Sequence, residues 1–253
     1  IRQISYNWAT FARAAYKVWV DVDPVELQRP NVKPDLGIVA DLKDFIPALL
    51  KADCEGPTEQ HREWLEWSLE RKRKFPTVLP EYETNQVCHP FVAMKAIFDA
   101  LDKDDVIVSA NATACVVAFQ AGALKEGQRH WSNSGSATMG YDLSAPVGIC
   151  AATDNQRRVI GLAGDGSIMM NIQELQTIAG NRLPVKIFLL NNSGYVSIFQ
   201  THRNFFNGVE VGGGPKSNVT FPDFGKVANA FGFEHFRIAR HGQLERTIAA
   251  APA

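Results

Sequence analysis

The sequence has almost no net charge, with 26 Lys and Arg against 27 Asp and Glu and a formal charge of −1. Without a basic excess, nothing favours binding to nucleic acid or to an anionic membrane surface, and we expect neither partner. No apolar run approaches the roughly 18 residues of a membrane helix, and the first residues have no signal-peptide layout. These absences predict a cytoplasmic protein.

Cysteine is also scarce, and its spacing excludes two further classes. The four cysteines lie far apart without a CxxC pair, which argues against structural zinc and against a disulfide framework. We therefore expect reduced thiols at Cys54, Cys88, Cys115 and Cys150. The chain opens with Ile1 rather than with methionine, and we expect it to be part of a longer protein.

The hydrophobic content of 45% over 253 residues is enough for a substantial core, in one large domain or two smaller ones. Residues 1–54 contain two short strand patterns and a helix pattern, which are typical of the last part of an α/β domain. Residues 55–87 are turn-rich, then helical, then extended, and we interpret them as a linker. Residues 88–253 are predicted to form a second domain.

From His89 onward, helix and strand patterns alternate along the chain. The strands are apolar on both faces, as in a parallel sheet that helices cover on each side. The predicted fold of this region is therefore α/β, with a doubly wound parallel sheet.

Two polar motifs follow strands of that sheet. The strand ending in VIGLA leads into Gly164, Asp165 and Gly166, and the strand VKIFLL leads into Asn191 and Asn192. Because ligands bind beyond the carboxyl ends of parallel strands, we expect the two motifs to meet there. A carboxylate and an amide oxygen suit Mg²⁺ or Ca²⁺, and glycines allow close approach of a phosphate group. The pair therefore indicates a site for magnesium and a diphosphate.

Alternatives to this site exist. Each motif alone is more often a plain turn. In either case, we expect Asn171 and Glu174 to form a capping pair for the helix between the two motifs. A dinucleotide site is less favoured, because GLAGDG has its glycines in the reverse order of GxGxxG.

The two motifs resemble the cofactor signature of thiamine-diphosphate enzymes, and the chain is most similar to the large-subunit acetolactate synthase group. The blocks that carry this resemblance are GDGSIMMNIQELQTI, LPVKIFLLNN, SGSATMGYDLSAPVG and FPDFGKVANAFG, with FARAAYKVWVDVDPVEL resembling the end of the group's central domain. The resemblance implies the thiamine-diphosphate-binding fold and an enzyme that decarboxylates a 2-keto acid, with pyruvate expected, and transfers the acyl unit to a second carbonyl. A simple decarboxylase and a non-catalytic cofactor-binding or dimerisation module stay open.

The resemblance also assigns roles to residues. Asp165, the side chain of Asn192 and the carbonyl of Gly194 would hold Mg²⁺, and Met139 would wedge between the two cofactor rings as the catalytic residue. Further cofactor contacts are implied at Thr113, Ala114, Ala137, Gly164, Gly166, Ser167, Tyr195 and Val196. Thr113, Ala114 and Cys115 depart from the Gly-Gln-His run of acetolactate synthases.

Other implications concern groups outside this site. The resemblance implies a homodimer or tetramer, in which an activating glutamate comes from an amino-terminal domain of the neighbouring subunit, and this chain offers no candidate for it. Asp23 and Asp41 lie where acetolactate synthases contact FAD, but turns and helix capping explain both equally well.

Overall fold

The computed structural model of the protein describes residues 7–52, 56–84 and 87–251. It separates into two compact units, residues 1–70 and residues 71–253. The separation falls inside the segment for which we predict a linker, and the domain boundaries stay a prediction. Cys54 lies outside the described residues.

The first unit contains one short parallel strand pair. Strand β1 (Val18–Asp21) pairs with β2 (Leu36–Val39), with Val18 opposite Leu36. The helix α1 (Leu42–Lys51) follows, and the carboxylate of Asp41 caps it by accepting the N–H of Lys43 at 2.9 Å. The carboxylate of Asp23 accepts the N–H of Val25 at 2.9 Å. Both aspartates therefore have local structural roles.

The segment around the unit boundary is partly as predicted. Helix α2 (Glu59–Lys74) confirms the predicted helix, but the stretch expected to be extended contains the 3-10 helix η4 (Pro80–Thr84). A proline is well suited to the first position of a helical turn, and the hydroxyl of Thr84 donates to the carbonyl of Glu81 at 2.7 Å. These local bonds favour the turn over an extended chain.

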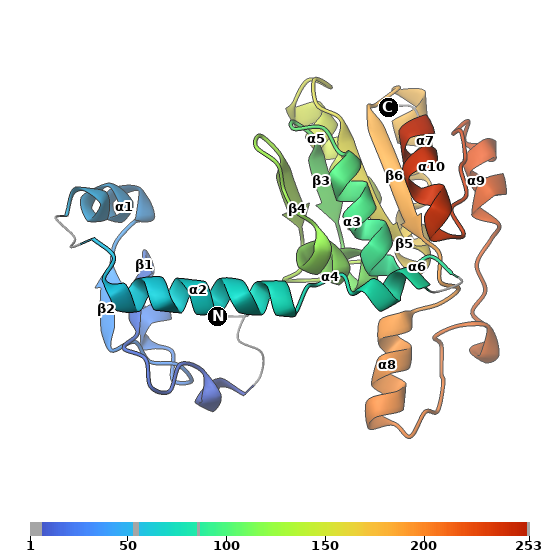
Figure 1. Ribbon diagram of the computed structural model, residues 1–253. Coiled ribbons are helices and arrows are strands. Elements are labelled where there is room, and N and C mark those ends of the chain that lie inside the picture. The colour runs from blue at the N-terminus through green and yellow to red at the C-terminus, as the bar shows by residue number, and fades with distance from the viewer. Residues whose placement is uncertain (1–6, 53–55, 85–86, 252–253) are drawn as a thin grey trace. The chain divides into compact units, whose positions relative to one another are not determined.

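The second unit is built on a four-stranded sheet, which confirms the predicted parallel fold (Figure 1). Its strands are β3 (Val106–Ser109), β4 (Arg129–Ser132), β5 (Val159–Gly164) and β6 (Val185–Leu190). They lie in the order β4-β3-β5-β6, and all three neighbouring pairs are parallel. The sequence did not predict β4, a short edge strand whose Arg129 and Trp131 are exposed.

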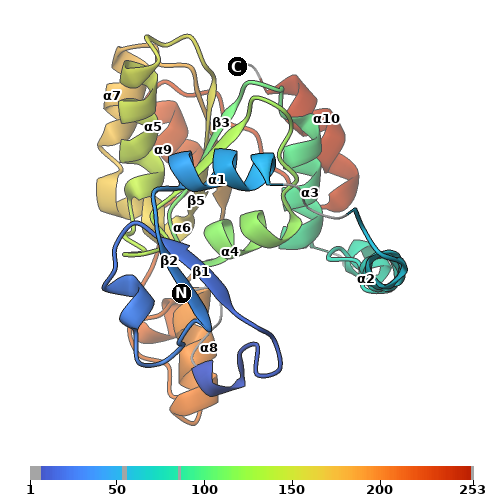
Figure 2. The same ribbon diagram turned by 90° about the vertical axis from the view of Figure 1, so that its left-hand side faces the viewer.

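Helices cover both faces of this sheet (Figure 2). One face packs against α3 (Pro90–Ala100), α4 (Ala112–Ala121) and α10 (Leu244–Ala250) through Ile107, Ile160 and Leu162. The other packs against α5 (Tyr141–Ala152), α7 (Glu174–Gly180) and α9 (Phe224–Ala230) through Val106, Val108 and Val159. Successive strand residues alternate between the two cores, so the central strands β3 and β5 are apolar except for Ser109.

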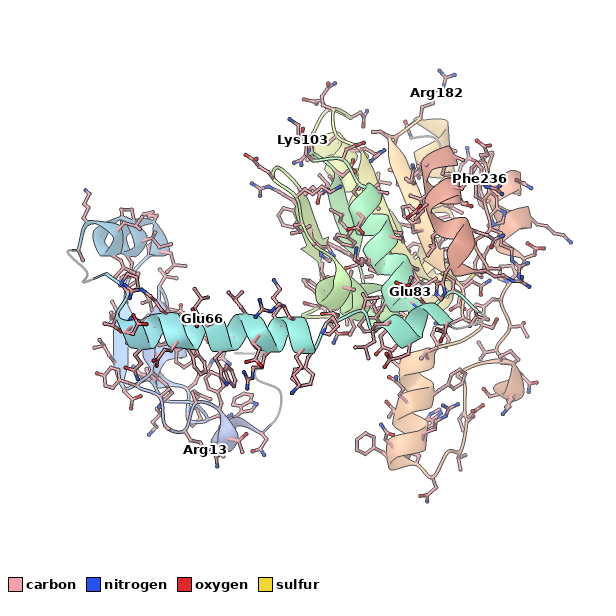
Figure 3. The ribbon with its side chains drawn as sticks, viewed as in Figure 1. Arg13, Glu66, Glu83, Lys103, Arg182 and Phe236 are labelled. Carbon is pink, nitrogen blue, oxygen red and sulfur yellow. The ribbon has the colours of Figure 1, made fainter. Side chains whose placement is uncertain are left out.

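The two ends of the sheet differ in what they carry. Lys103 precedes β3 and Arg182 precedes β6, and both lie at the amino end of the strands (Figure 3). Helix α6 (Asp165–Ile168) begins at the opposite end, directly after β5, and α8 (Val196–Phe205) follows β6. Short 3-10 turns complete the described chain: η2 (Trp8–Thr10), η3 (Glu26–Gln28), η5 (Met169–Asn171), η6 (Pro215–Ser217) and η7 (His241–Gln243). None of the helices in the described ranges is both long and apolar enough to cross a membrane.

Candidate functional site

The site is centred on Asp165, at the carboxyl end of β5. Its carboxylate accepts three backbone N–H groups, from Gly166 at 2.7 Å, Asn192 at 3.1 Å and Gly194 at 3.1 Å. The last two follow β6, whose Leu190 lies opposite Gly164 of β5 in the sheet register. Parallel pairing of the two strands therefore brings the Gly-Asp-Gly and Asn-Asn motifs together.

Asp165 is a buried acid that has no cationic partner among the described side chains. Only 2% of the residue is exposed, and none of the Lys, Arg or His side chains that the structure describes forms an ion pair with it. Burial raises the pKa of Asp165, and the N–H groups of Gly194 and Gly166 act in the opposite direction. Burying a carboxylate is costly unless a cation or several hydrogen bonds compensate it. The three N–H dipoles supply part of that compensation.

The glycines of the two motifs are closely surrounded. A methyl group at position 166 would lie 2.0 Å from Cε1 of Tyr195, and one at position 194 would lie 2.7 Å from the ring of Phe199. The N–H of Tyr195 donates to the carbonyl of Gly213 at 2.8 Å, just before α8 begins at Val196. Any side chain at 166 or 194 would displace these neighbours.

Ser167 connects the Asp165 turn (residues 164–167) to the predicted Met139 site. Its hydroxyl oxygen accepts the N–H of Gly140 at 3.0 Å, and the amide of Asn111 donates to the same oxygen at 3.5 Å. Gly140 is the residue before α5, and Met139 directly precedes it with 37% of its surface exposed. The segments of Asn111 and Gly140 thus both bond to the hydroxyl of Ser167.

Asn171 does not cap a helix, which corrects the predicted pair with Glu174. Helix α7 begins at Glu174 after Gln173, with no side-chain cap. The chain stays helical from α6 through η5, so its backbone has no free helix start at Asn171. The Asn171 amide instead donates to the carbonyl of Gly140 at 3.3 Å and to the hydroxyl of Ser144 at 3.1 Å.

The other predicted residues lie on neighbouring segments. Thr113 is half-buried and Ala114 is buried in the first turn of α4, and Ala137 is exposed in the loop before Met139. No hydrogen bond within the described part of the chain connects Thr113 or Ala137 to the Asp165 turn. Ala112, the first residue of α4, is left-handed, with φ of +48°.

Sequence reasoning missed Asn111 and Asp142. The side chain of Asp142 is 1% exposed in the first turn of α5, on the same helical face as the buried Pro146 and Cys150. Pro146 and Cys150 follow Asp142 by four and eight residues, a spacing that places all three on one face of a helix. This spacing was a signal in the sequence that Asp142 is buried.

The oxygen groups at this edge suit a hard cation. They comprise the carboxylate of Asp165, the exposed side-chain amide of Asn192 and the backbone carbonyl of Gly194. Such ligands are typical of Mg²⁺, which also binds substrate phosphates and water. Nowhere in residues 7–52, 56–84 and 87–251 do three or more His, Cys, Asp or Glu side chains form a metal-binding group.

Comparison with known proteins finds relatives along most of the chain. It is 32% identical over 248 residues to the acetolactate synthase large subunit of Pyropia yezoensis, which covers 95% of this chain and 40% of the relative. It is 31% identical over 244 residues to the acetolactate synthase large subunit of Parasynechococcus marenigrum (strain WH8102), covering 96% of this chain and 38% of the relative. For acetolactate synthase 1, chloroplastic, of Zea mays, the identity is 29% over 246 residues, with 94% and 38% covered.

The chain spans about 40% of the length of these curated relatives. A family profile described as "Thiamine pyrophosphate enzyme, C-terminal TPP binding domain" matches residues 112–253. This range includes both polar motifs and the loop between β4 and α5 that carries Met139 (residues 133–140, the Met139 loop). Residues 112–253 therefore form a C-terminal TPP-binding domain, and this protein belongs to the thiamine pyrophosphate enzymes.

Proposed function

We propose that the edge of the sheet at the carboxyl ends of β5 and β6, which carries Asp165, binds thiamine diphosphate through Mg²⁺. The observation that carries the proposal is the buried carboxylate of Asp165, which accepts three N–H groups but has no ion-pair partner among the described side chains. A divalent ion would compensate this charge. Asp165, the amide oxygen of Asn192 and the carbonyl of Gly194 would hold the ion, together with oxygens of the diphosphate.

The diphosphate would lie along the glycines of the Asp165 turn. Gly164 has open space where a side chain would project, so its backbone can be approached closely. The backbone of Ser167 would lie beside the diphosphate. The remaining contacts proposed are Thr113, Ala114, Gly166, Tyr195 and Val196.

The rings of the cofactor would lie against the loop that carries Met139. The partly exposed side chain of Met139 would support them, and the carbonyl of Ala137 would accept a hydrogen bond from the aminopyrimidine. When bound, thiamine diphosphate supplies the nucleophilic carbon and the electron sink for decarboxylating a 2-keto acid. The residues of this chain bind and orient it, and the packed Tyr195 and Phe199 rings help to exclude water.

The activity that we propose is acyl transfer from a 2-keto acid, with pyruvate as donor, to a second carbonyl compound. Its support is the family of residues 112–253 together with relatives named acetolactate synthase. We also propose a homodimer or tetramer. Val116 and Phe119 on α4 and Trp131 on β4 are exposed large apolar side chains, and such side chains favour an interface with another protein surface.

The test of this proposal is a calorimetric titration of the protein with thiamine diphosphate, first with Mg²⁺ and then with excess EDTA. We expect the wild type to lose at least tenfold in affinity without the ion. Asp165→Asn preserves the shape of the side chain, but it removes the charge that attracts the cation and one of the two oxygens that accept N–H groups. Its affinity should be equally weak in both buffers.

A matched control is Asp99→Ala, which removes a carboxylate from an exposed ion pair with Lys95. This variant should bind like the wild type, with the same dependence on Mg²⁺. If Asp165→Asn bound thiamine diphosphate as tightly as the wild type in the presence of Mg²⁺, the proposed metal site would be wrong.

A further inference from the structure

Asp142 is a buried acid that the proposed function does not use. Only 1% of the residue is exposed, and neither carboxylate oxygen has a hydrogen bond of acceptable geometry from any described residue. Burial raises the pKa of Asp142 to about 6, and the hydroxyl of Ser167 acts to lower it. An acid in such surroundings is costly, and native structures seldom retain one without a role.

Ser167 has the complementary property. A hydroxyl oxygen accepts two hydrogen bonds and donates one. The oxygen of Ser167 accepts from Gly140 and from Asn111, so its lone pairs are used. Its proton is in no hydrogen bond to a described residue, and the carboxyl of Asp142 lies near enough for this hydroxyl to lower the pKa of Asp142. Within the described part of the chain, the carboxyl of Asp142 therefore lacks a donor, and the hydroxyl of Ser167 beside it lacks an acceptor.

The backbone N–H and the backbone carbonyl of Gly140 are both hydrogen-bonded to side chains. Ser167 binds its N–H and Asn171 binds its carbonyl. Gly140 is left-handed, with φ of +88°, and a methyl group there would lie 2.6 Å from the Asn171 amide nitrogen. Because Met139 is the preceding residue, these two bonds determine where its backbone lies.

We propose that Asp142 is a positioning residue of the cofactor site, whose carboxyl accepts a hydrogen bond from the hydroxyl of Ser167 and so keeps the Ser167 oxygen directed at the N–H of Gly140. Asp142 thereby holds the Met139 loop at a fixed position relative to the Asp165 turn. Its effect on the cofactor rests on the proposed function, in which Met139 supports the rings and Ser167 lies at the diphosphate. The effect of Asp142 on Gly140 is independent of the proposed function.

The first test measures exchange of the Gly140 amide hydrogen by NMR, without any cofactor. In Asp142→Ala the hydroxyl of Ser167 is free to rotate, and we expect the Gly140 amide to exchange about fivefold faster, as for the loss of one ordinary hydrogen bond. Asp142→Asn retains an acceptor oxygen and should stay within twofold of the wild type. The amide of Gly122, bonded to the carbonyl of Ala118 at 2.9 Å, serves as the control and should not change.

A double variant tests whether Asp142 acts through Ser167. Ser167→Ala alone should also accelerate exchange of the Gly140 amide, and adding Asp142→Ala should accelerate it no further. Additive effects, or an Asp142→Ala variant with wild-type exchange at Gly140, would overturn the proposal.

The affinity for thiamine diphosphate with Mg²⁺ is the second readout. It should fall about fivefold in Asp142→Ala and return in Asp142→Asn. If neither variant nor Asp165→Asn changed the affinity while the Gly140 amide responded, the cofactor assignment would be wrong and the positioning role right. If Asp165→Asn abolished binding but Asp142→Ala left Gly140 unchanged, the opposite would hold.

Discussion

Replacing Asp142 by asparagine should change how the stability of the protein depends on pH. Burial raises the pKa of Asp142 from 3.8 to about 6, so the folded state holds a proton that the unfolded state has already lost. A raised acid pKa contributes stability that is complete below pH 3.8 and is lost as the pH rises to about 6. Above that pH the contribution of Asp142 to the free energy of unfolding no longer changes.

The size of the effect follows from these two values. With pKa values of 3.8 unfolded and about 6 folded, ionisation of Asp142 lowers the free energy of unfolding by about 1.6 kcal/mol at pH 5 and about 3 kcal/mol at pH 7.5. Asparagine has the same shape and no charge. The difference in unfolding free energy between Asp142→Asn and the wild type should therefore increase by about 1.4 kcal/mol between the two pH values.

Urea unfolding at pH 5 and pH 7.5, followed by circular dichroism, measures this difference directly. All other titrating groups are shared by the two proteins and cancel in the comparison. A difference that stays constant with pH within about 0.4 kcal/mol would refute the reasoning, because it would mean that Asp142 titrates alike in the folded and unfolded chain.

Three further substitutions have defined outcomes. Gly166→Ala should lower the free energy of unfolding by about 1–3 kcal/mol in urea, because the new methyl group would displace the ring of Tyr195. Arg158→Ala should lower it by about 3 kcal/mol, because the buried carboxylate of Asp105 would lose its hydrogen bonds at 2.9 and 2.5 Å. Met139→Ala should weaken thiamine diphosphate binding about tenfold by calorimetry, with a change in unfolding free energy below about 1 kcal/mol because the side chain is partly exposed.

The control for Arg158 is Lys95→Ala, which breaks an exposed ion pair with Asp99 and should cost less than about 0.5 kcal/mol. Equal losses in the two variants would contradict the role of burial. For Met139, a loss of stability without a loss of cofactor affinity would indicate a packing residue only. For Gly166, wild-type stability would show that Tyr195 moves aside freely.

The sheet and the meeting of the two polar motifs could be predicted from the sequence. Strand β5 is apolar throughout and β6 is apolar except for Lys186, because helices cover both faces of the sheet. Parallel pairing then places the residues after them at one edge, so Asp165 and Asn192 follow from strand pattern and topology alone.

Other features depend on tertiary contacts that no local pattern carries. Strand β4 has exposed and half-buried residues in a short edge position, so its hydrophobic pattern is weak. Asn171 has the residue type and spacing of a helix cap, but its partner Gly140 lies 31 positions earlier. The helical spacing of Asp142 with Pro146 and Cys150 indicates burial of the acid, but the matching proton on Ser167 is visible only once both residues are placed in space.

The most direct test of the central claim is a crystal structure of the protein with thiamine diphosphate and Mn²⁺ in place of Mg²⁺, with the anomalous signal of the metal measured. We predict one metal peak about 2.1 Å from a carboxylate oxygen of Asp165, with the amide oxygen of Asn192 and the carbonyl of Gly194 as further ligands. In that complex the diphosphate lies against Gly166 and Ser167. A bound cofactor with no metal at Asp165, or a metal peak elsewhere on the chain, would contradict this prediction.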